Sequence, residues 1–336
     1  MRTPPLRLRT RAERRSPQPS PELRPIGRER RVSSDDGTAL YVEEFGAQQP
    51  TGTIVLAHGY WQSSRLWAGQ VRDLIAARPD LDVVVYDHRG HGRSDRCARE
   101  TSHIEQLGRD LAVVLDAVAP TGPVVLAGHS MGGMTMMALA EQRPELFGDR
   151  IVGAAFVGTS CGGLADVTYG LPRPVVKAVL RTLPRLQAKA IRDEQAGKRR
   201  RLAPGTARLI FGPGADRADV QMTLEDMLGC SAETAAAFFE TFADHDRRHA
   251  LAALEKVPAM VIVGDHDLLC PMAHSKVIAE QLPLSELSVY PGAGHMVQLE
   301  RRPEVSRRLL DLLDRTIPSA NGATAGEPMS VGSRAT

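Results

Sequence analysis

The stretch PVVLAGHSMGGMTMMALAEQ, residues 123–142, places an apolar run, a glycine-rich turn and a helical pattern in immediate succession. The run 123–127 predicts a buried strand, and the segment 133–142 predicts a helix. Between them, residues 128–132 fit the pattern G-x-S-x-G, in which a strained turn exposes the serine and the glycines avoid collisions that any Cβ would cause. We therefore expect Ser130 to be a nucleophile at the end of a strand.

Two further groups are needed, because a serine hydroxyl is a weak nucleophile until a base removes its proton and an acid orients that base. His295 follows the strand-like run 287–290 in a glycine-containing loop, which suits a general base. Asp265 and Asp267 both follow the apolar run 260–263, at the edge where open α/β sheets place their sites. Both aspartates are candidates for the orienting acid.

Backbone amides are expected to stabilise the oxyanion that forms when the serine attacks a carbonyl group. One donor is the amide of Met131, which follows the nucleophile and stands at the positive end of the predicted helix. The other is the amide of Tyr60, just past the apolar run 53–57, where Gly59 allows the loop to approach Ser130. Loss of one such donor usually lowers the rate by about 10²- to 10³-fold.

Short β-branched runs alternate with helical patterns along most of the chain. The expected parallel strands are 53–57, 82–86, 123–127, 151–157 and 260–263. A hairpin that turns at residues 36–37 precedes them. Helical periodicity covers 67–75 and 104–118, and the Ser102-x-x-Glu105 pattern predicts a capping box for the second helix. The alternation predicts an α/β fold with a doubly wound, mostly parallel sheet.

The alternation stops between residues 157 and 260, a gap too long for a simple connection in a compact domain. Apolar residues at helical spacing predict that this insertion is a helical cap over residues 161–250. The α/β core then consists of residues 30–160 and 251–317. Both ends of the chain are expected to be disordered, as an arginine- and proline-rich arm at 1–29 and a small, polar tail at 318–336.

Composition excludes several classes of function. A formal net charge of +2 offers no broad field for nucleic acid, and no apolar run has the length that a bilayer needs. The cysteines lack C-x-x-C spacing and residues 1–31 lack the apolar core of a secretory signal, so we expect a reduced, cytoplasmic location. A transit peptide is the alternative for the ten arginines of residues 1–31. His88 and His91 lack a third ligand at suitable spacing, so we expect no metal.

Five motifs in this order resemble the α/β-hydrolase fold superfamily over residues 30–317, close to its serine esterases, lipases and cofactor-free haloperoxidases. The motifs are His58-Gly59, Asp87-His88-Arg89-Gly90-His91-Gly92-Arg93-Ser94, the GHSMGG segment 128–133, Gly264-Asp265-His266-Asp267, and Gly294-His295. The order serine, aspartate, histidine is also that of the superfamily. The resemblance implies that the second aspartate, Asp267, is the triad acid, that Tyr60 supplies an oxyanion amide, and that the insertion is a lid. Haloalkane dehalogenases and epoxide hydrolases of this fold carry aspartate where this chain has Ser130, so we set those chemistries aside.

Residues and resemblance together predict a serine hydrolase that cleaves a carboxylic ester through an acyl-enzyme, with a small-molecule substrate, water as cosubstrate and no cofactor. An apolar acyl pocket is expected from Trp61, Met222, Met227, Phe238 and Met296, each of which also suits a packed core. The same groups serve hydrolysis of a thioester, a lactone or a carbon–carbon bond, or peracid formation by a haloperoxidase-like protein. The alternative from another class is a catalytically silent protein that binds a small ligand under the cap. The natural substrate and the oligomeric state stay open.

Basic residues recur at every fourth position in the expected cap, at Arg173, Lys177, Arg181, Arg185 and Lys189. This spacing places them along one face of a helix. The pattern predicts either a solvated face, interrupted at Pro184, or a basic rim that makes weak contact with an anionic membrane.

Overall fold

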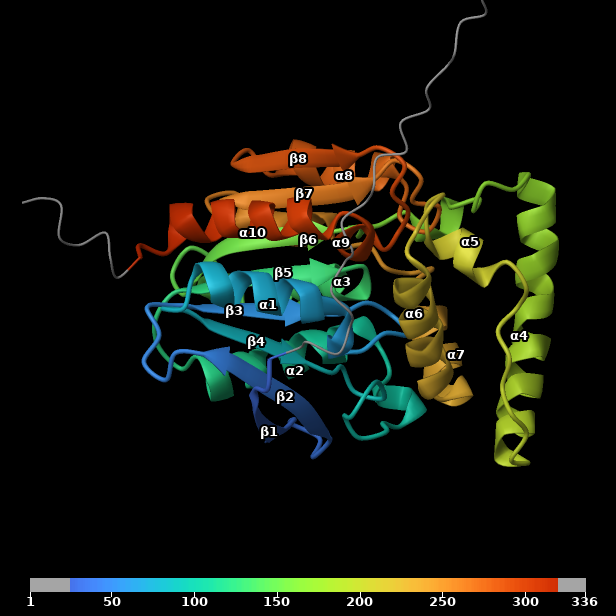
Figure 1. Ribbon diagram of the computed structural model, residues 1–336. Coiled ribbons are helices and arrows are strands. Elements are labelled where there is room, and N and C mark those ends of the chain that lie inside the picture. Colours follow the sequence, from blue (N-terminus) through green and yellow to red (C-terminus); the bar gives the residue numbers. More distant parts are fainter. Residues whose placement is uncertain (1–24, 320–336) are drawn as a thin grey trace, which may run out of the picture.

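The computed structural model describes residues 25–319 and contains an eight-stranded sheet with the order β1-β2-β4-β3-β5-β6-β7-β8 (Figure 1). The pairs β1–β2 and β2–β4 are antiparallel, and all the other neighbouring pairs in this sheet are parallel. The strands are β1 (Arg28–Ser33), β2 (Ala39–Gly46), β3 (Thr53–Ala57), β4 (Asp82–Tyr86), β5 (Val124–His129), β6 (Ile151–Val157), β7 (Ala259–Gly264) and β8 (Ser285–Tyr290).

Helices cover both faces of the sheet. One face is covered by α2 (Ile104–Val118), α3 (Met131–Gln142) and α8 (Met272–Gln281). The other face is covered by α1 (Ala68–Ala77), α9 (Val297–Glu300) and α10 (Arg302–Thr316). Val55 and Val84 pack in the first layer, whereas Ile54 and Val83 pack in the second. Successive strand residues are therefore buried on opposite faces, which explains why the strands read as continuous apolar runs.

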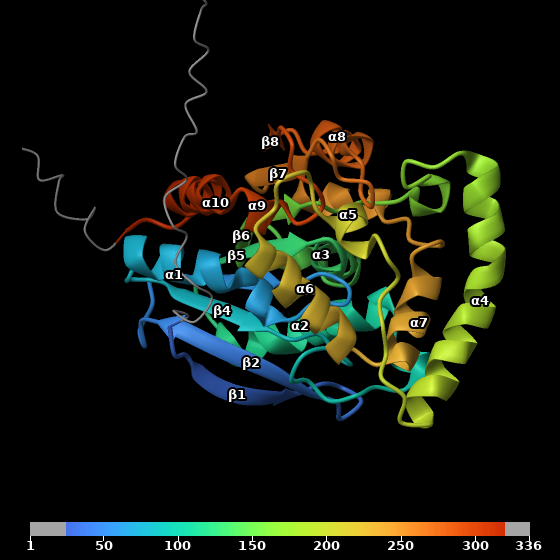
Figure 2. The same cartoon turned by 45° about the vertical axis from the view of Figure 1, so that its right-hand side comes forward.

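The segment between β6 and β7 is helical and lies beyond the carboxyl ends of the parallel strands (Figure 1). Its helices are α4 (Arg173–Gln195), α5 (Thr206–Ile210), α6 (Arg217–Gly229) and α7 (Ala232–Thr241). The longest, α4, packs on α7 at the outside of the molecule, as both views show (Figure 2). Pro184 lies inside α4, which continues through it, so the expected interruption was wrong. In the described part of the chain, no helix is both long and apolar enough to cross a membrane.

Most predicted strands occur where the sequence placed them. The strands at 53–57, 82–86 and 151–157 have the expected bounds, and Ser33 pairs with Ala39 across the predicted hairpin. β1 begins at Arg28, inside the expected arm 1–29, because Arg28 pairs in register with Glu44 of β2. Residues 1–24 of that arm and 320–336 of the expected tail lie outside the described residues.

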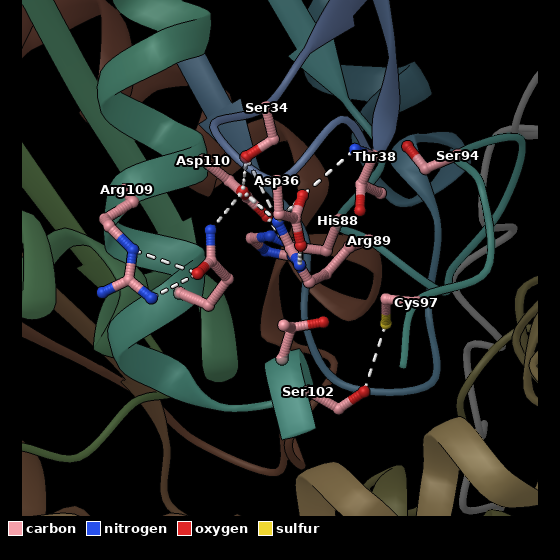
Figure 3. Close-up of polar contacts among 12 residues, drawn as sticks. Ser34, Asp36, Thr38, His88, Arg89, Ser94, Cys97, Ser102, Arg109 and Asp110 are labelled. Carbon is pink, nitrogen blue, oxygen red and sulfur yellow. Dashed lines mark hydrogen bonds and ion pairs between the residues drawn. The ribbon is translucent and has the colours of Figure 1, made fainter. Parts of the chain in front are cut away.

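The predicted capping box at the start of α2 was wrong. His103 is the N-cap, and its Nδ1 accepts a hydrogen bond from the Gln106 amide at 3.2 Å. The Ser102 hydroxyl instead donates to the Ala98 carbonyl at 2.9 Å and contacts the Cys97 sulfur at 3.1 Å (Figure 3). A short 3-10 turn over Arg99–Thr101 ends at Ser102, whose backbone amide donates to the Arg99 carbonyl. The α-helix therefore begins one residue later than the capping box predicted.

Candidate active site

Ser130 occupies the turn between β5 and α3 in a strained backbone conformation. Its φ of 51° lies in the left-handed region, which residues other than glycine seldom adopt. The Ser130 amide donates to the Val157 carbonyl at 2.9 Å, and the Thr159 hydroxyl donates to the Ser130 carbonyl at 2.7 Å. These two bonds hold the strained turn in place. The predicted succession of strand, turn and helix around Ser130 is therefore confirmed.

The two glycines of the G-x-S-x-G pattern have a steric role. A Cβ on Gly128 would lie 2.5 Å from the backbone of Gly132, and a Cβ on Gly132 would lie 2.4 Å from the carbonyl oxygen of Ala57. A side chain at either position would therefore force two backbone segments apart. Glycine at these positions lets α3 begin directly against β3.

A second turn, after β3, lies directly against the serine. A Cβ on Gly59 would be 2.6 Å from Nδ1 of His129 and 3.2 Å from Cβ of Ser130. Tyr60 follows in this turn, and its hydroxyl donates to the Ala235 carbonyl of α7 at 2.5 Å. Met131 is the first residue of α3, so its amide has no acceptor within the helix. The two amides predicted to bind an oxyanion therefore belong to the two turns that meet at Ser130.

His295 and Asp267 form a buried, hydrogen-bonded pair. Nδ1 of His295 lies 2.8 Å from Oδ2 of Asp267, and the two side chains are only 6% and 0% exposed. The other carboxylate oxygen, Oδ1, accepts from the amides of Leu269 at 2.9 Å and Cys270 at 2.8 Å. Because the carboxylate is an acceptor, Nδ1 of His295 carries the proton, and Nε2 is left to accept one.

Asp265, the other candidate acid, is used differently. Its Oδ1 accepts from the Gly292 amide at 2.7 Å and pairs with Nδ1 of His266 at 2.7 Å. The hydrogen bond from His266 lowers the pKa of Asp265 below its usual range. With its side chain 37% exposed, Asp265 joins the loop after β7 to the loop after β8, whereas Asp267 contacts His295.

His129 connects the serine turn to the histidine loop. Its Nε2 donates to the carbonyl oxygen of His295 at 2.9 Å, and the centroids of the two rings are 4.7 Å apart. Burial lowers the pKa of His129 well below its usual range, so the ring is neutral at pH 7. His129 is therefore a neutral hydrogen-bond donor to the loop that carries His295. The His295 amide also donates to the carbonyl of Ile210 at 2.7 Å, a contact with the helical insertion that no sequence pattern indicated.

The residues predicted to line an acyl pocket are packed in more than one place. Trp61, Met227 and Met296 belong to the apolar layer on the α1 and α10 side of the sheet. Phe238 instead packs with Met131 and Tyr60. The fifth residue, Met222, is buried in α6. Their role as substrate contacts stays a prediction.

Arg89, in the loop after β4, joins three parts of the core that are distant in the sequence (Figure 3). Its guanidinium is fully buried and forms two hydrogen bonds of 2.7 Å with Asp110 of α2. A further ion pair of 2.6 Å reaches Asp36 of the hairpin, and the hydrogen bond from Arg89 holds the pKa of that carboxyl well below its usual range. The Ser34 hydroxyl donates to Asp110 at 2.5 Å. Sequence reasoning did not find this cluster, because its partners lie 53 and 21 residues from Arg89.

His58, His88 and His91 form a second buried cluster. The backbone amide of His88 donates to Nε2 of His58 at 2.9 Å, and Nε2 of His88 donates to the His58 carbonyl at 3.0 Å. Nδ1 of His91 lies 2.9 Å from the Arg89 carbonyl. Burial lowers the pKa of His58 to about 4 and that of His91 to about 3. These rings are therefore neutral, and their hydrogen bonds join the loops after β3 and β4.

Comparison with known proteins agrees with this architecture. Residues 48–302 match the family described as Serine aminopeptidase, S33. The chain belongs to this family of α/β hydrolases. The fold and the matched span establish this protein as an α/β-fold hydrolase.

Several relatives cover nearly the whole hydrolase fold. A 2-hydroxy-6-oxononadienedioate/2-hydroxy-6-oxononatrienedioate hydrolase of Burkholderia vietnamiensis is 28% identical, and the match covers 84% of this chain and 93% of that protein. A non-heme haloperoxidase of Rhodococcus erythropolis is 26% identical, with 84% and 98% covered. Among solved structures, the esterase EaEST from Exiguobacterium antarcticum superposes with a TM-score of 0.69 at 20% identity, covering 84% of this hydrolase and 98% of that chain. At that identity the superposition shows a shared fold.

Proposed function

We propose that this α/β hydrolase cleaves carboxylic esters with an apolar acyl group through an acyl-enzyme, with Ser130, His295 and Asp267 as its triad. The observation that carries the proposal is the strained turn of Ser130 beside the buried His295–Asp267 pair, to which His129 of the same turn is joined by its hydrogen bond to the His295 carbonyl. Strain of this kind persists where the surrounding structure requires it, and such positions cluster at functional sites.

In the proposed reaction, Oγ of Ser130 attacks the ester carbonyl while Nε2 of His295 takes the hydroxyl proton. The amides of Tyr60 and Met131 bind the resulting oxyanion. When the carbon–oxygen bond to the alcohol breaks, His295 returns the proton to the leaving alcohol. Water then attacks the acyl-enzyme by the same route, releasing the acid and restoring Ser130. Asp267 keeps Nδ1 protonated throughout and stabilises the imidazolium.

The helical insertion is proposed to act as a lid over this site. Its helices are tied to the turn that carries the Tyr60 amide, because the Tyr60 hydroxyl binds Ala235 and the Ser63 hydroxyl donates to Asp226 of α6 at 2.7 Å. Phe238 is fully buried against Met131. We therefore propose that the insertion moves away from this turn to admit an acyl chain, which would occupy the space between Phe238 and Met131.

Turnover of p-nitrophenyl esters of increasing acyl length tests the proposal. We expect hydrolysis by the wild-type protein and a loss of about 10⁶-fold in kcat for Ser130→Ala, by analogy with removal of the nucleophile from a serine protease. A wild-type protein that hydrolyses none of these esters would contradict the ester function.

A second candidate is hydrolysis of another kind of bond by the same groups. It is favoured by the relatives, which include a 2-hydroxy-6-oxononadienedioate/2-hydroxy-6-oxononatrienedioate hydrolase and a non-heme haloperoxidase. A thioester, a lactone, a β-diketone, an aminoacyl p-nitroanilide, and peroxide with halide should therefore be tested beside the esters. A kcat/KM higher for one of these substrates than for every ester would move the assignment to that bond. Absence of turnover with all of them would favour a silent protein that binds a small ligand.

A further inference from the structure

One flank of α4, next to the side that packs on α7, carries a row of exposed apolar residues. Val175, Val179 and Leu186 are 45%, 51% and 57% exposed, and Val176 is the buried residue of this helix. Val175 and Val179 are four residues apart and Leu186 lies seven further on, so the three share one side of the helix. Isolated exposed apolar side chains are common on protein surfaces, but a row along one helix marks a contact surface.

Positive charge accompanies this row. The helix carries Arg173, Lys177, Arg181, Arg185, Lys189 and Arg192, and no acidic residue before Asp193. Within residues 25–319, neither Lys177, Arg181 nor Arg185 forms an ion pair, whereas Lys189 pairs with Asp193. At 100° per residue, Arg185, Lys189 and Arg192 flank one edge of the apolar row, whereas Lys177 and Arg181 lie on the opposite side of the helix. We call the surface made of the three apolar residues and these three flanking basic residues the outer face of α4.

We infer that the outer face of α4 binds anionic lipid surfaces. An amphipathic helix with basic residues beside an apolar row binds at the lipid–water interface by burying the apolar side chains and attracting lipid headgroups. A second copy of this chain fits the face less well, because two outer faces in contact would oppose rows of like charge. The charge therefore selects a negatively charged surface.

The position of α4 would place a bound bilayer close to the candidate active site. α4 is the outermost layer beyond the carboxyl ends of the strands, and Ser130 follows the carboxyl end of β5 (Figures 1 and 2). A bilayer bound to the outer face of α4 would lie on the side of the molecule where the insertion covers the site. Delivery of acyl substrates from the bilayer rests on the proposed ester function, whereas lipid binding itself does not.

Vesicle sedimentation tests the inference with the full chain. The seven arginines of residues 1–24 are first replaced by glutamine, so that this segment does not contribute its own charge. We expect this protein to sediment with phosphatidylglycerol vesicles and not with phosphatidylcholine vesicles. Binding should weaken between ~0.01 M and ~0.15 M salt, where the Debye length falls from about 30 Å to about 8 Å.

Two triple variants in that background locate the binding surface. Arg185→Gln with Lys189→Gln and Arg192→Gln should lower the partition coefficient at low salt by about ten- to hundredfold, because each basic residue near the bilayer adds about tenfold or less. Val175→Ser with Val179→Ser and Leu186→Ser should lower the binding that persists at ~0.15 M salt.

A matched control removes the same charge elsewhere. Lys256, Lys276 and Arg307 are exposed, none is on α4, and none forms an ion pair within the described chain. Changing these three to glutamine should leave vesicle binding within about twofold, since charges distant from the bilayer are screened. Circular dichroism and thermal unfolding should be the same for all three variants, because every substituted side chain is exposed.

Several outcomes would overturn the inference. They are no sedimentation with phosphatidylglycerol, equal losses in the α4 and control variants, or a dimer in sedimentation velocity that the α4 apolar variant dissociates. Turnover of a soluble short-chain ester separates this inference from the proposed function. Turnover without vesicle binding contradicts only the lipid surface, and vesicle binding without turnover contradicts only the ester function.

Discussion

Asp267 divides its two carboxylate oxygens between His295 and a pair of backbone amides. In Asp267→Asn the side-chain oxygen would stay with the amides of Leu269 and Cys270, and the new NH₂ would face Nδ1 of His295. That nitrogen would have to become an acceptor, which moves the ring proton to Nε2 and removes the base. We predict a loss of about 10⁴-fold in kcat, by analogy with the same change in a serine protease triad. Steady-state turnover of a p-nitrophenyl ester measures it.

Asp265→Asn is the matched control for this substitution, two residues away. The asparagine would keep an acceptor for the Gly292 amide and lose the charge that pairs with His266. We expect kcat to stay near the wild-type value and the free energy of unfolding to fall by about 1 kcal/mol or less. Equal losses of kcat in the two variants, with folding unchanged, would refute the assignment of Asp267.

For single residues, the sequence predicted environments formed by neighbours in the chain and missed contacts between residues far apart in the chain. The environment of Ser130 was predictable because strand, turn and helix are contiguous in the chain. The two aspartates could not be separated by spacing alone, since both follow β7, and the resemblance was needed to choose Asp267. The contact between His295 and Ile210 could not be predicted, because it depends on how the insertion folds back onto the core.

At the scale of elements, the Arg89–Asp110 pair joins the loop after β4 to α2, and Asp36 extends it to the β1–β2 hairpin. Removing Asp110 takes away two hydrogen bonds of the fully buried Arg89 guanidinium and leaves Asp36, at the rim of the cluster, as its remaining ion-pair partner. We predict that Asp110→Leu lowers the free energy of unfolding by about 3–5 kcal/mol. Urea unfolding followed by circular dichroism measures the change.

The double variant Arg89→Met with Asp110→Leu is the control for that prediction. It removes both buried charges together, so its loss of stability should be well below that of Asp110→Leu alone. A loss in the double variant equal to or larger than that of the single variant would show that the pair itself provides the stability. A loss below about 1 kcal/mol in Asp110→Leu would contradict the importance of the cluster.

Elements buried on both faces were the ones that the sequence predicted best. Strands such as β3, β4 and β6 are continuous apolar runs because helices cover both sides of the sheet. The start of α2 was mispredicted because Ser102, the expected cap, ends a 3-10 turn and its hydroxyl donates to the Ala98 carbonyl. Periodicity predicted that α4 is a helix, but it could not show that Val175 and Val179 would be exposed, since apolar spacing alone does not identify what a helix packs against.

At the scale of the whole molecule, buried neutral histidines make stability depend on pH. Burial lowers the pKa of His58 and His245 to about 4 and that of His91 to about 3, and it lowers the pKa values of His88 and His129 well below their usual range. The unfolded chain takes up protons at these rings near pH 6.5, whereas the folded chain does not. Stability is therefore highest above pH 6.5 and falls as the pH drops toward 4. Each ring contributes about 1.4 kcal/mol per pH unit in that range.

Four carboxyl groups oppose this trend, because burial raises the pKa of Asp82, Asp219, Asp226 and Glu300. Burial raises the pKa of Asp82 and Asp219 to about 6, so the folded state binds their protons first and gains stability as the pH falls from 6 toward 4. Because the five histidines outnumber them, we predict a net decrease. Urea unfolding at pH 7.5, 6 and 5 measures it, and unfolding free energies that rise toward pH 5 would contradict it. His245→Gln should make the decrease shallower.

We propose that Ser130, activated by His295 and Asp267, is the nucleophile of this hydrolase. A fluorophosphonate probe tests it most directly, because Oγ of the nucleophile displaces fluoride and forms a phosphonate ester that stands in for the tetrahedral intermediate. We predict one adduct per chain by intact mass, located on Ser130 by peptide mapping, absent in Ser130→Ala and formed much more slowly in Asp267→Asn. An unlabelled wild-type protein, or an adduct on another residue together with full ester turnover by Ser130→Ala, would contradict the claim.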